Sequence, residues 1–361
     1  MIINYNMLGM DLTGGVRVIL EIADGLVSRG HDVCMTSLGP KNSHKWFGLR
    51  ARTNYIEKQG IGRAFELGIR SGLSRIFEID LNPYLAIKRL SENTPDCDIN
   101  VATACFTAFS VFRSDKGVPF YHMQHYEPLF FDEEYLKRFA EETYYLPLNR
   151  IANSIWLRNQ MKDKYDYDVP VVNPAIDHNV FYPRPAHKNI SKMRVVCFGK
   201  QARWKGFPEA LSAMELVRKS RADVELIVYG IRRPSYESNV PYHFVKAPTD
   251  QDLAGLYSSA DAVICPSWYE SFPLVPLEAM ACGAPVITTP HGTEDYAFHE
   301  ENCLVVPPKD PKALAGAIND LLDNESLREN FKRKGPKIAQ QFTWDKTVDK
   351  VERMFKEKLA V

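Results

Sequence analysis

Along the first half of the chain, the spacing of apolar residues switches repeatedly between a strand-like and a helix-like pattern. Short apolar runs, typical of buried strands, are separated by stretches such as residues 16–28, where apolar residues share one face of a helix. Gly30 ends that helix. The predicted strands of this half are residues 1–5, 33–36, 99–102, 119–122 and 150–153. This alternation predicts a parallel sheet with helices on both faces.

The pattern stops at residues 173–185, which contain three prolines and little periodicity, and then begins again. The second series predicts strands at residues 194–198, 224–229, 243–245, 262–265, 285–288 and 303–306, and helices at 208–219, 250–259 and 277–282. We therefore expect an α/β protein with two Rossmann-like, doubly wound domains that face each other across a cleft. The expected division is an N-terminal domain 1–172, a linker 173–190, a C-terminal domain 191–342 and a helix 343–361 that crosses back to the N-terminal domain.

Length and composition agree with two globular domains and exclude some functions. The chain has 361 residues, more than one core usually holds. Lys and Arg number 45, as do Asp and Glu, and this balance argues against nucleic-acid binding, which needs a positive excess. Seven cysteines without a CxxC motif suit reduced thiols in the cytoplasm. We expect no signal peptide and no membrane-spanning helix.

Residues 41–77 are more basic than their surroundings and carry interleaved aromatic side chains. A basic helix with an aromatic edge can lie on an anionic membrane surface, which would place the protein peripherally on the inner face of a membrane. The alternative is a solvated helix that packs on its own sheet.

A cation-rich loop follows the predicted strand 194–198. Gly199 to Gly206 holds Lys200, Arg203 and Lys205 between two glycines. Glycine lets a backbone approach a ligand closely, and the three cations suit phosphate charge. The spacing is not that of a Walker loop. A basic surface turn is the alternative.

Two carboxylates, Glu270 and Glu278, lie eight positions apart around an apolar, proline-broken run. Because Pro276 fits the first turn of a helix, the free amides near Leu274 and Val275 would form an anion-binding helix N-terminus. Cations and amides suit a diphosphate, and carboxylates suit the hydroxyls of a sugar and a ribose. Two alternatives are a solvent-facing pair and a glycosidase pair, whose carboxylates must lie about 5–9.5 Å apart.

The stretch from Glu270 to Glu278 resembles the EX7E motif of retaining, GT-B-fold glycosyltransferases of family 4. The resemblance extends over Pro266-Ser267, residues 278–286, residues 304–307, the cation loop, the linker around Ile176-Asp177 and Phe342-Thr343-Trp344. It covers most of residues 170–345. In the N-terminal half it rests on Gly14-Gly15-Val16 and on residues 124–128, which look like an acceptor-domain loop of some bacterial polysaccharide glycosyltransferases.

The resemblance implies a role for each matching position. Lys200 and Lys205 would hold the donor diphosphate, Glu270 the hydroxyls of the donor sugar and Glu278 those of the ribose. Gly15 would close on the phosphate, and His125 would face the donor sugar. On the acceptor side stand Gln124 and Glu127. The remaining donor-binding positions are Gly199, Arg203, Val245, Lys246, Ser271, Phe272, Leu274 and Val275.

Three positions depart from the family pattern. Lys200 replaces the usual Arg, so bidentate phosphate binding is lost unless Arg203 supplies it. Pro273 replaces a common Gly and has no N–H to donate. His125 stands where closer relatives carry Asp, and a structural loop histidine is the alternative; His122 is expected to be structural.

The resemblance implies hexose transfer from a nucleotide-diphosphate sugar, here expected to be a UDP-sugar, to a glycan or lipid-linked acceptor, with retention and without a metal. Asp96-Cys97-Asp98 has the letters of a DxD metal motif but precedes a strand. The alternatives are a nucleotide-sugar 2-epimerase or sugar phosphorylase of the same fold and a non-catalytic nucleotide-sugar binder. A nicotinamide dehydrogenase would need a GxGxxG fingerprint, whose third glycine is absent after Gly14-Gly15.

Overall fold

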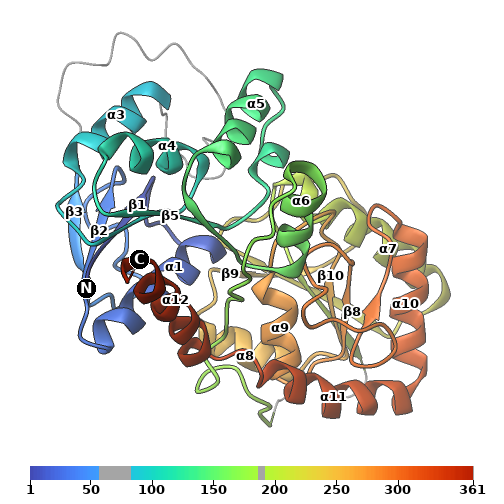
Figure 1. The fold of residues 1–361 in the computed structure, drawn as a ribbon. Coiled ribbons are helices and arrows are strands. Elements are labelled where there is room, and N and C mark those ends of the chain that lie inside the picture. Colours follow the sequence, from blue (N-terminus) through green and yellow to red (C-terminus); the bar gives the residue numbers. More distant parts are fainter. Residues whose placement is uncertain (57–82, 186–191, 361) are drawn as a thin grey trace. The chain divides into compact units, whose positions relative to one another are not determined.

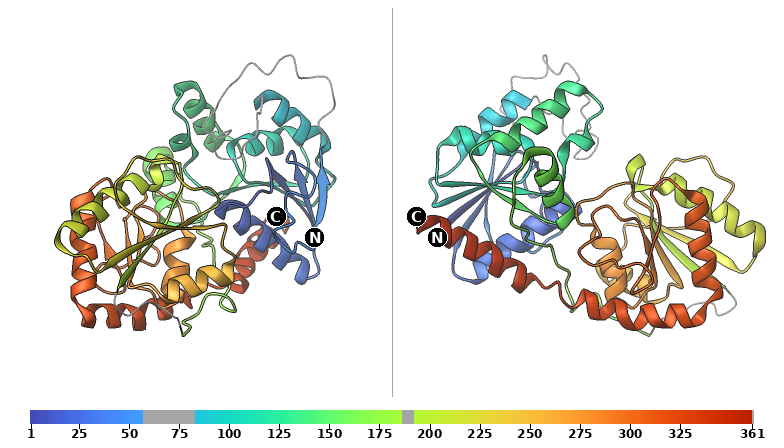
Figure 2. Two further views of the ribbon diagram at one scale, coloured as in Figure 1. Left: turned by 180° about the vertical axis from the view of Figure 1, so that it is seen from behind. Right: turned by 45° about the vertical axis from the view of Figure 1, so that its right-hand side comes forward.

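The computed structural model describes residues 1–56, 83–185 and 192–360. The chain forms two compact units, and each is described by itself. Unit 1 comprises Met1–Asn173 together with Trp344–Val361, and unit 2 comprises Pro174–Thr343. Figures 1 and 2 show a twisted sheet flanked by helices in each unit.

Unit 1 is built on a parallel sheet with the strand order β3-β2-β1-β4-β5-β6. Its strands are β1 (Ile2–Met7), β2 (Asp32–Ser37), β3 (Arg52–Tyr55), β4 (Ile99–Ala102), β5 (Val118–Met123) and β6 (Asn149–Ala152). Its α-helices in the described residues are α1 (Gly14–Ser28), α3 (Pro83–Asn93), α4 (Cys105–Ser114), α5 (Glu134–Glu142), α6 (Ile155–Tyr165) and α12 (Trp344–Leu359). Short 3₁₀ turns lie at Glu127–Phe130 (η1) and Thr143–Tyr145 (η2).

Unit 2 repeats this topology with the strand order β12-β11-β10-β7-β8-β9, again parallel. Its strands are β7 (Met193–Phe198), β8 (Val224–Gly230), β9 (His243–Lys246), β10 (Ala262–Cys265), β11 (Val286–Thr288) and β12 (Leu304–Val305). Its helices are η3 (Arg203–Lys205), α7 (Phe207–Ser220), α8 (Asp250–Ser258), α9 (Leu274–Ala281), α10 (Pro311–Asp323) and α11 (Glu325–Ala339). Buried aliphatic side chains of the strands and of α7, α9 and α10 form its core.

Every strand that the hydrophobic pattern predicts is present, within two residues at each end. The prediction of a basic helix is wrong for residues 41–56, which form turns and the edge strand β3, and residues 57–77 lie outside the described part of the chain. Arg50 and Arg52 pair there with Asp24 and Asp32 of their own unit. In the described residues, no helix is long and apolar enough to cross a membrane.

Helix α12 packs on unit 1, although unit 2 precedes it in the sequence. Val348, Val351 and Phe355 are buried, and the Phe355 ring meets the Phe120 ring of β5 at 4.7 Å between centroids. α1 approaches α12 so closely that a Cβ on Gly25 would lie 2.5 Å from Val348 Cγ2. A side chain at position 25 would therefore force Val348 or α12 to shift.

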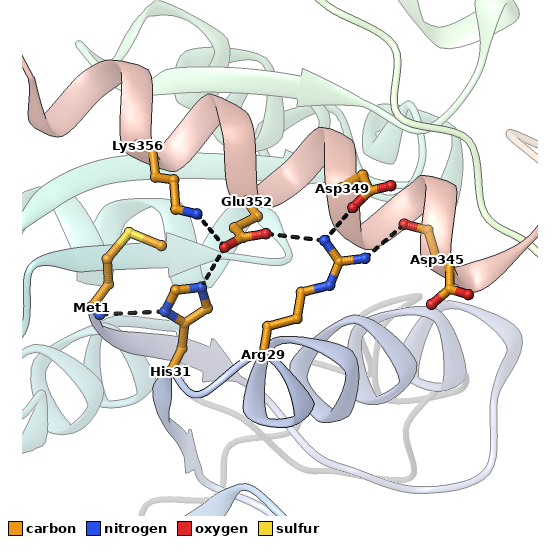
Figure 3. Close-up of polar contacts among 7 residues, drawn as sticks. All are labelled: Met1, Arg29, His31, Asp345, Asp349, Glu352 and Lys356. Atoms are coloured by element: carbon orange, nitrogen blue, oxygen red, sulfur yellow. Dashed lines mark hydrogen bonds and ion pairs between the residues drawn. The ribbon is translucent and has the colours of Figure 1, made fainter.

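A polar network lies beside this apolar contact (Figure 3). Arg29 contacts both Asp349 and Glu352, and His31 Nε2 lies 2.9 Å from Glu352 Oε1. The Met1 amine lies 3.3 Å from His31 Nδ1. Hydrogen bonds from Lys356, His31 and Arg29 lower the pKa of the Glu352 carboxyl to about 2. The last helix is thus attached to unit 1 by both packing and charge.

Candidate functional site in unit 2

The cation loop and the carboxylate loop lie side by side because their strands are neighbours. Residues 199–206 follow β7, and residues 266–273 follow β10, which pairs with β7 in register Ile264 to Cys197. Between β7 and β10 the strand order of the sheet reverses. This is the topological switch point, where ligands of doubly wound sheets bind beyond the carboxyl ends of the strands.

The two loops touch at Gly206. This residue has a φ of 69°, and a Cβ added to it would lie 1.9 Å from the carbonyl oxygen of Pro266. Both the left-handed conformation and the close approach exclude any larger residue. Gly199 is also constrained, since its Cβ would meet Val228 Cγ1 at 2.4 Å. The glycines that bound the cation loop therefore fix its position against β8 and β10.

Lys205 and Glu270 form an ion pair at the centre of the site. Lys205 Nζ lies 2.5 Å from Glu270 Oε1, with 22% and 13% of their side chains exposed. The Ser267 hydroxyl donates a hydrogen bond of 2.8 Å to the same carboxylate oxygen. The structure thus brings together a predicted phosphate cation and the predicted sugar-binding carboxylate.

Lys200 is a second cation of this cluster. Burial and, to a smaller extent, the nearby charge of Lys205 lower the pKa of its ammonium group to about 8, while Glu270 acts in the opposite direction. Arg203 is exposed, and its guanidinium carbon lies 5.6 Å from the centre of the Trp268 ring. The three cations of the loop thus have different surroundings. Lys205 is paired with Glu270, Lys200 is largely removed from water, and Arg203 lies over the Trp268 ring.

Helix α9 begins at Leu274, so that Leu274 and Val275 occupy its first two positions. Pro273 precedes them as the N-cap residue and makes no side-chain cap hydrogen bond. Uncapped amides at a helix N-terminus favour an anion. The predicted helix 277–282 therefore starts three residues earlier than expected, and this start is compatible with the predicted role of the two amides.

Three other predicted donor-binding residues near α9 are largely buried. Glu278 is 8% exposed, Ser271 2% and Phe272 7%. The Phe272 ring packs against Tyr296 and Phe342 in the core of the unit, which leaves its backbone as the part available to a ligand. Val245 and Lys246 end the edge strand β9, where both side chains are exposed.

The remaining predicted site residues belong to unit 1. Gly15 is the second residue of α1, and a Cβ there would lie 3.8 Å from Gln124 Cβ. His125 is 6% exposed, and its ring packs against Phe130 and Trp156 at 4.4 and 5.7 Å between centroids. Gly15, near the start of α1, therefore lies close to Gln124, which directly follows β5.

Glu127 lies inside unit 1, which does not favour the predicted acceptor-side role. Its carboxylate accepts hydrogen bonds from the Tyr121 hydroxyl at 2.7 Å and from the Cys105 amide at 2.9 Å. Burial raises the pKa of this carboxyl. Glu127 therefore ties β5 to the start of α4.

The described residues contain no group of three or more His, Cys, Asp or Glu side chains that could hold a metal ion. The two acids of the DxD-like sequence have structural partners. Asp98 accepts a hydrogen bond from the Ile2 amide at 2.7 Å, and Asp96 lies 3.1 Å from Lys116 Nζ.

Sequence reasoning missed several residues that shape the site. Ser267 holds Glu270, and Gly292 packs on its backbone: a Cβ there would lie 2.5 Å from the Glu270 carbonyl oxygen. Trp268 joins the carboxylate loop to Glu209 of α7 by a hydrogen bond of 3.1 Å. The proximity of Ser267 to Glu270 in sequence was a usable signal, whereas Gly292 and Glu209 approach the loop only in the folded unit.

Comparison with known proteins places this site in a family. Residues 192–324 match the family described as glycosyl transferases group 1. The chain carries a glycosyl transferases group 1 domain. Both loops of the site lie within this group 1 domain.

Sequence similarity to two bacterial proteins extends over more residues than the match to the group 1 family. The chain is 28% identical over 270 residues to the O-antigen biosynthesis protein RfbC of Myxococcus xanthus, covering 71% of the chain and 20% of that protein. It is 29% identical over 222 residues to a D-inositol 3-phosphate glycosyltransferase of Paenarthrobacter aurescens, covering 55% of the chain and 54% of that enzyme. The chain thus spans between a fifth and about half of the length of these relatives.

Solved structures show the fold of the whole chain. Sucrose-phosphate synthase from Thermosynechococcus elongatus aligns with a TM-score of 0.76 at 17% identity, covering 99% of each chain. Anabaena HepE, solved in complex with UDP-glucose, aligns with a TM-score of 0.73 at 17% identity over 99% of each chain. The predicted fold class, GT-B, is confirmed by these glycosyltransferase structures.

Proposed function

We propose that the chain is a glycosyltransferase that moves a hexose from a nucleotide-diphosphate sugar to a hydroxyl of a glycan or lipid-linked acceptor. We further propose retention of the anomeric configuration and no requirement for a metal. The observation that supports this best is the Lys205–Glu270 pair, because it joins a phosphate-binding group to a hydroxyl-binding group at the switch point of the group 1 domain. UDP-sugars are the donor class to test first, since HepE was solved with UDP-glucose.

Donor binding would replace the ion pair by ligand contacts. The diphosphate would take the ammonium groups of Lys200 and Lys205 and the amides at the start of α9, while hydroxyls of the sugar would donate to Glu270. Glu278 would accept from the ribose hydroxyls. The internal pair neutralises both groups before the donor arrives, which limits the cost of holding them partly out of water.

In the reaction, the bond between the anomeric carbon and the β-phosphate oxygen breaks as the acceptor oxygen bonds to the same face of that carbon. The acceptor proton passes to the leaving diphosphate, so no covalent enzyme intermediate is required. Negative charge grows on the diphosphate as the bond breaks. Lys200, Lys205 and the α9 N-terminus are positioned to stabilise that charge, the kind of contribution that is usually the largest in such catalysis.

The decisive experiment combines donor screening with one variant. Purified protein is incubated with UDP-, GDP-, dTDP- and ADP-sugars and a glycan acceptor mixture without added metal and with EDTA, and product configuration is read by NMR. Lys205→Ala should lower kcat by about 10²–10³-fold at saturating donor. Lys219→Ala, an exposed lysine in the last turn of α7, is the matched control and should leave kcat unchanged.

Other outcomes would point to a different function or contradict one part of the proposal. Sugar turnover without an acceptor would favour a 2-epimerase, and binding without turnover would indicate a nucleotide-sugar binding protein. Inversion at the anomeric carbon would contradict the stereochemical part of the proposal alone. Unchanged kcat in Lys205→Ala would contradict the role given to this lysine.

A further inference from the structure

Trp268 connects the two loops of the site through its backbone as well as its side chain. Its amide donates a hydrogen bond of 2.7 Å to the carbonyl of Trp204, in the cation loop. Its indole Nε1 donates to Glu209 Oε1 at 3.1 Å, in the first turn of α7. One residue of the carboxylate loop therefore holds both the cation loop and the helix that follows it.

The aromatic surroundings of Trp268 add a second set of contacts. The neighbouring rings of Trp204 and Tyr269 stack across the two loops, 6.4 Å apart and inclined by 8°. Two cations lie over the Trp268 ring, Arg203 at 5.6 Å and Lys309 at 4.2 Å from its centre. Cations at these distances are attracted by an indole face.

Two further contacts join the same two loops. Gly206 touches Pro266, and Lys205 forms an ion pair with Glu270. Lys205 directly follows Trp204, and Glu270 lies two residues after Trp268. Any shift of Trp268 relative to Trp204 would therefore change the separation of Lys205 and Glu270.

Glu209 depends on the indole for its hydrogen bonding. Its Oε2 atom is buried and has no hydrogen-bond partner in the described part of the chain, and its Oε1 atom accepts the indole N–H of Trp268. A partly buried carboxylate that loses this donor is left with unfavourable desolvation, and its side chain would move toward water. The Trp268–Glu209 hydrogen bond thus fixes the position of the Glu209 carboxylate as well as that of the Trp268 indole.

We propose that Trp268, held by Glu209, is a positioning residue that sets the geometry between Lys205 and Glu270, and with it the fit of the diphosphate and the sugar. The inference rests on the proposed function for its kinetic consequences. The contact between the two loops is internal to the protein and is testable without any substrate. Trp268 itself need touch neither the sugar nor the diphosphate.

The kinetic test uses three single variants and one double variant. Trp268→Phe keeps a ring and removes the N–H, Glu209→Ala removes the acceptor, and Glu209→Gln keeps an oxygen that can accept. Because displacement of reacting groups by about 1 Å can cost roughly 10²-fold, Trp268→Phe and Glu209→Ala should lower kcat tenfold or more with little change in donor KM. Glu209→Gln should retain kcat within about twofold, because the amide oxygen replaces the carboxylate oxygen.

A purely structural role predicts a different pattern. It lowers the melting temperature but leaves kcat per folded molecule unchanged. Positioning through one contact also makes the double variant Trp268→Phe/Glu209→Ala no slower than the slower single variant, since both remove the same hydrogen bond. Unchanged kcat in both single variants, equal losses in Glu209→Gln and Glu209→Ala, or multiplied losses in the double variant would each overturn the proposal.

Amide hydrogen exchange in the ligand-free protein separates this inference from the proposed function. Glu209→Ala should speed exchange in residues 199–206 and 266–273 and leave β8 as in the wild type. If the wild type transfers no sugar but the two loops loosen together, the proposed function fails and the loop contact stands. If the wild type is active and neither exchange nor kcat changes, the positioning role fails alone.

Discussion

Lys200 and Lys205 lie five residues apart in one loop, yet their ammonium groups have different surroundings. Lys205 is neutralised by Glu270, whereas Lys200 is largely buried beside Lys205 and its pKa is lowered to about 8. A diphosphate would raise that pKa again by supplying opposite charge. We therefore expect Lys200 to make diphosphate binding sensitive to alkaline pH.

We predict that affinity for UDP falls as pH rises through 8. If UDP binds only the protein in which Lys200 is protonated, affinity should fall about tenfold between pH 7 and pH 9, since the protonated fraction falls by that factor. Isothermal titration with UDP across this range measures the change. Lys200→Arg, whose guanidinium stays charged, should remove the dependence. A wild-type profile that is flat to pH 9 would contradict the assignment.

His122 provides a residue-scale prediction in unit 1. It is 1% exposed in β5, and both ring nitrogens lack a hydrogen-bond partner in the described part of the chain. Burial lowers its pKa to about 4. Between pH 6.5 and 4 the unfolded state binds the proton and the folded state does not, so stability falls as pH decreases through this window.

The expected loss attributable to His122 between pH 6.5 and pH 5 is about 2 kcal/mol, from 1.36 kcal/mol per pH unit. Urea denaturation of wild type and His122→Leu at both values isolates this contribution. The leucine variant should lose about 2 kcal/mol less than the wild type over the same interval. Equal losses in the two proteins would show that the ring is protonated, or hydrated, in the folded state.

At the scale of elements, the segment that follows β11 packs against the backbone of the carboxylate loop at Gly292. Gly292 has a φ of 88°, and its added Cβ would lie 2.5 Å from the Glu270 carbonyl oxygen and 2.8 Å from that of Ser271. A side chain there must displace the backbone that carries Glu270. The β11 segment therefore contributes to the site without placing a side chain in it.

Gly292→Ala should lower sugar transfer at least tenfold and destabilise unit 2 by about 1–3 kcal/mol, the range for backbone strain and close contact. Gly316→Ala is the control. Gly316 is exposed in helix α10 with no atom within 4 Å of its added Cβ, so alanine should be neutral or stabilise by up to about 1 kcal/mol. Transfer rates and melting temperatures measure both. A Gly292→Ala protein with wild-type transfer rate and melting temperature would contradict this prediction and show that the loop tolerates displacement.

The elements were largely predictable because strands buried on both faces read as short apolar runs between amphipathic helices. β3 was not, because it is an edge strand whose Arg52 and Asn54 carry polar side chains, and its basic neighbours suggested a helix.

At the site, Lys205 and Glu270 were predicted from motif spacing. Glu209 and Gly292 were not, because they reach the loop only through tertiary packing. Glu127 resembled an acceptor-side residue, and its hydrogen bonds to Tyr121 and Cys105 form only in the folded unit.

At the scale of the molecule, the chain passes from unit 1 into unit 2 and returns through α12. The return is stabilised by the buried Phe355 ring against Phe120 and by the contacts of Glu352 with Arg29 and His31. Unit 1 therefore depends on residues at both ends of the sequence, whereas unit 2 is continuous.

Phe355→Ala should destabilise unit 1 by about 3–5 kcal/mol, the usual cost of removing a buried aromatic ring. Lys350→Ala, at an exposed position of the same helix, should change stability by less than about 0.5 kcal/mol. Amide exchange distinguishes the units: β1 and β5 should lose protection in Phe355→Ala, while β7 and β10 keep it. Equal loss in both sheets, or none in β1 and β5, would contradict a role confined to unit 1.

The return of α12 also determines when unit 1 can finish folding during synthesis. The ribosome must add the 170 residues of Pro174–Thr343 after the last strand of unit 1 and before α12. At about 5–20 residues per second, this takes roughly 10 to 30 s. Throughout that interval the apolar surface around Phe120 lacks its helix and is accessible to chaperones. The unit translated first is thus completed last, the reverse of the usual N-terminal-first order.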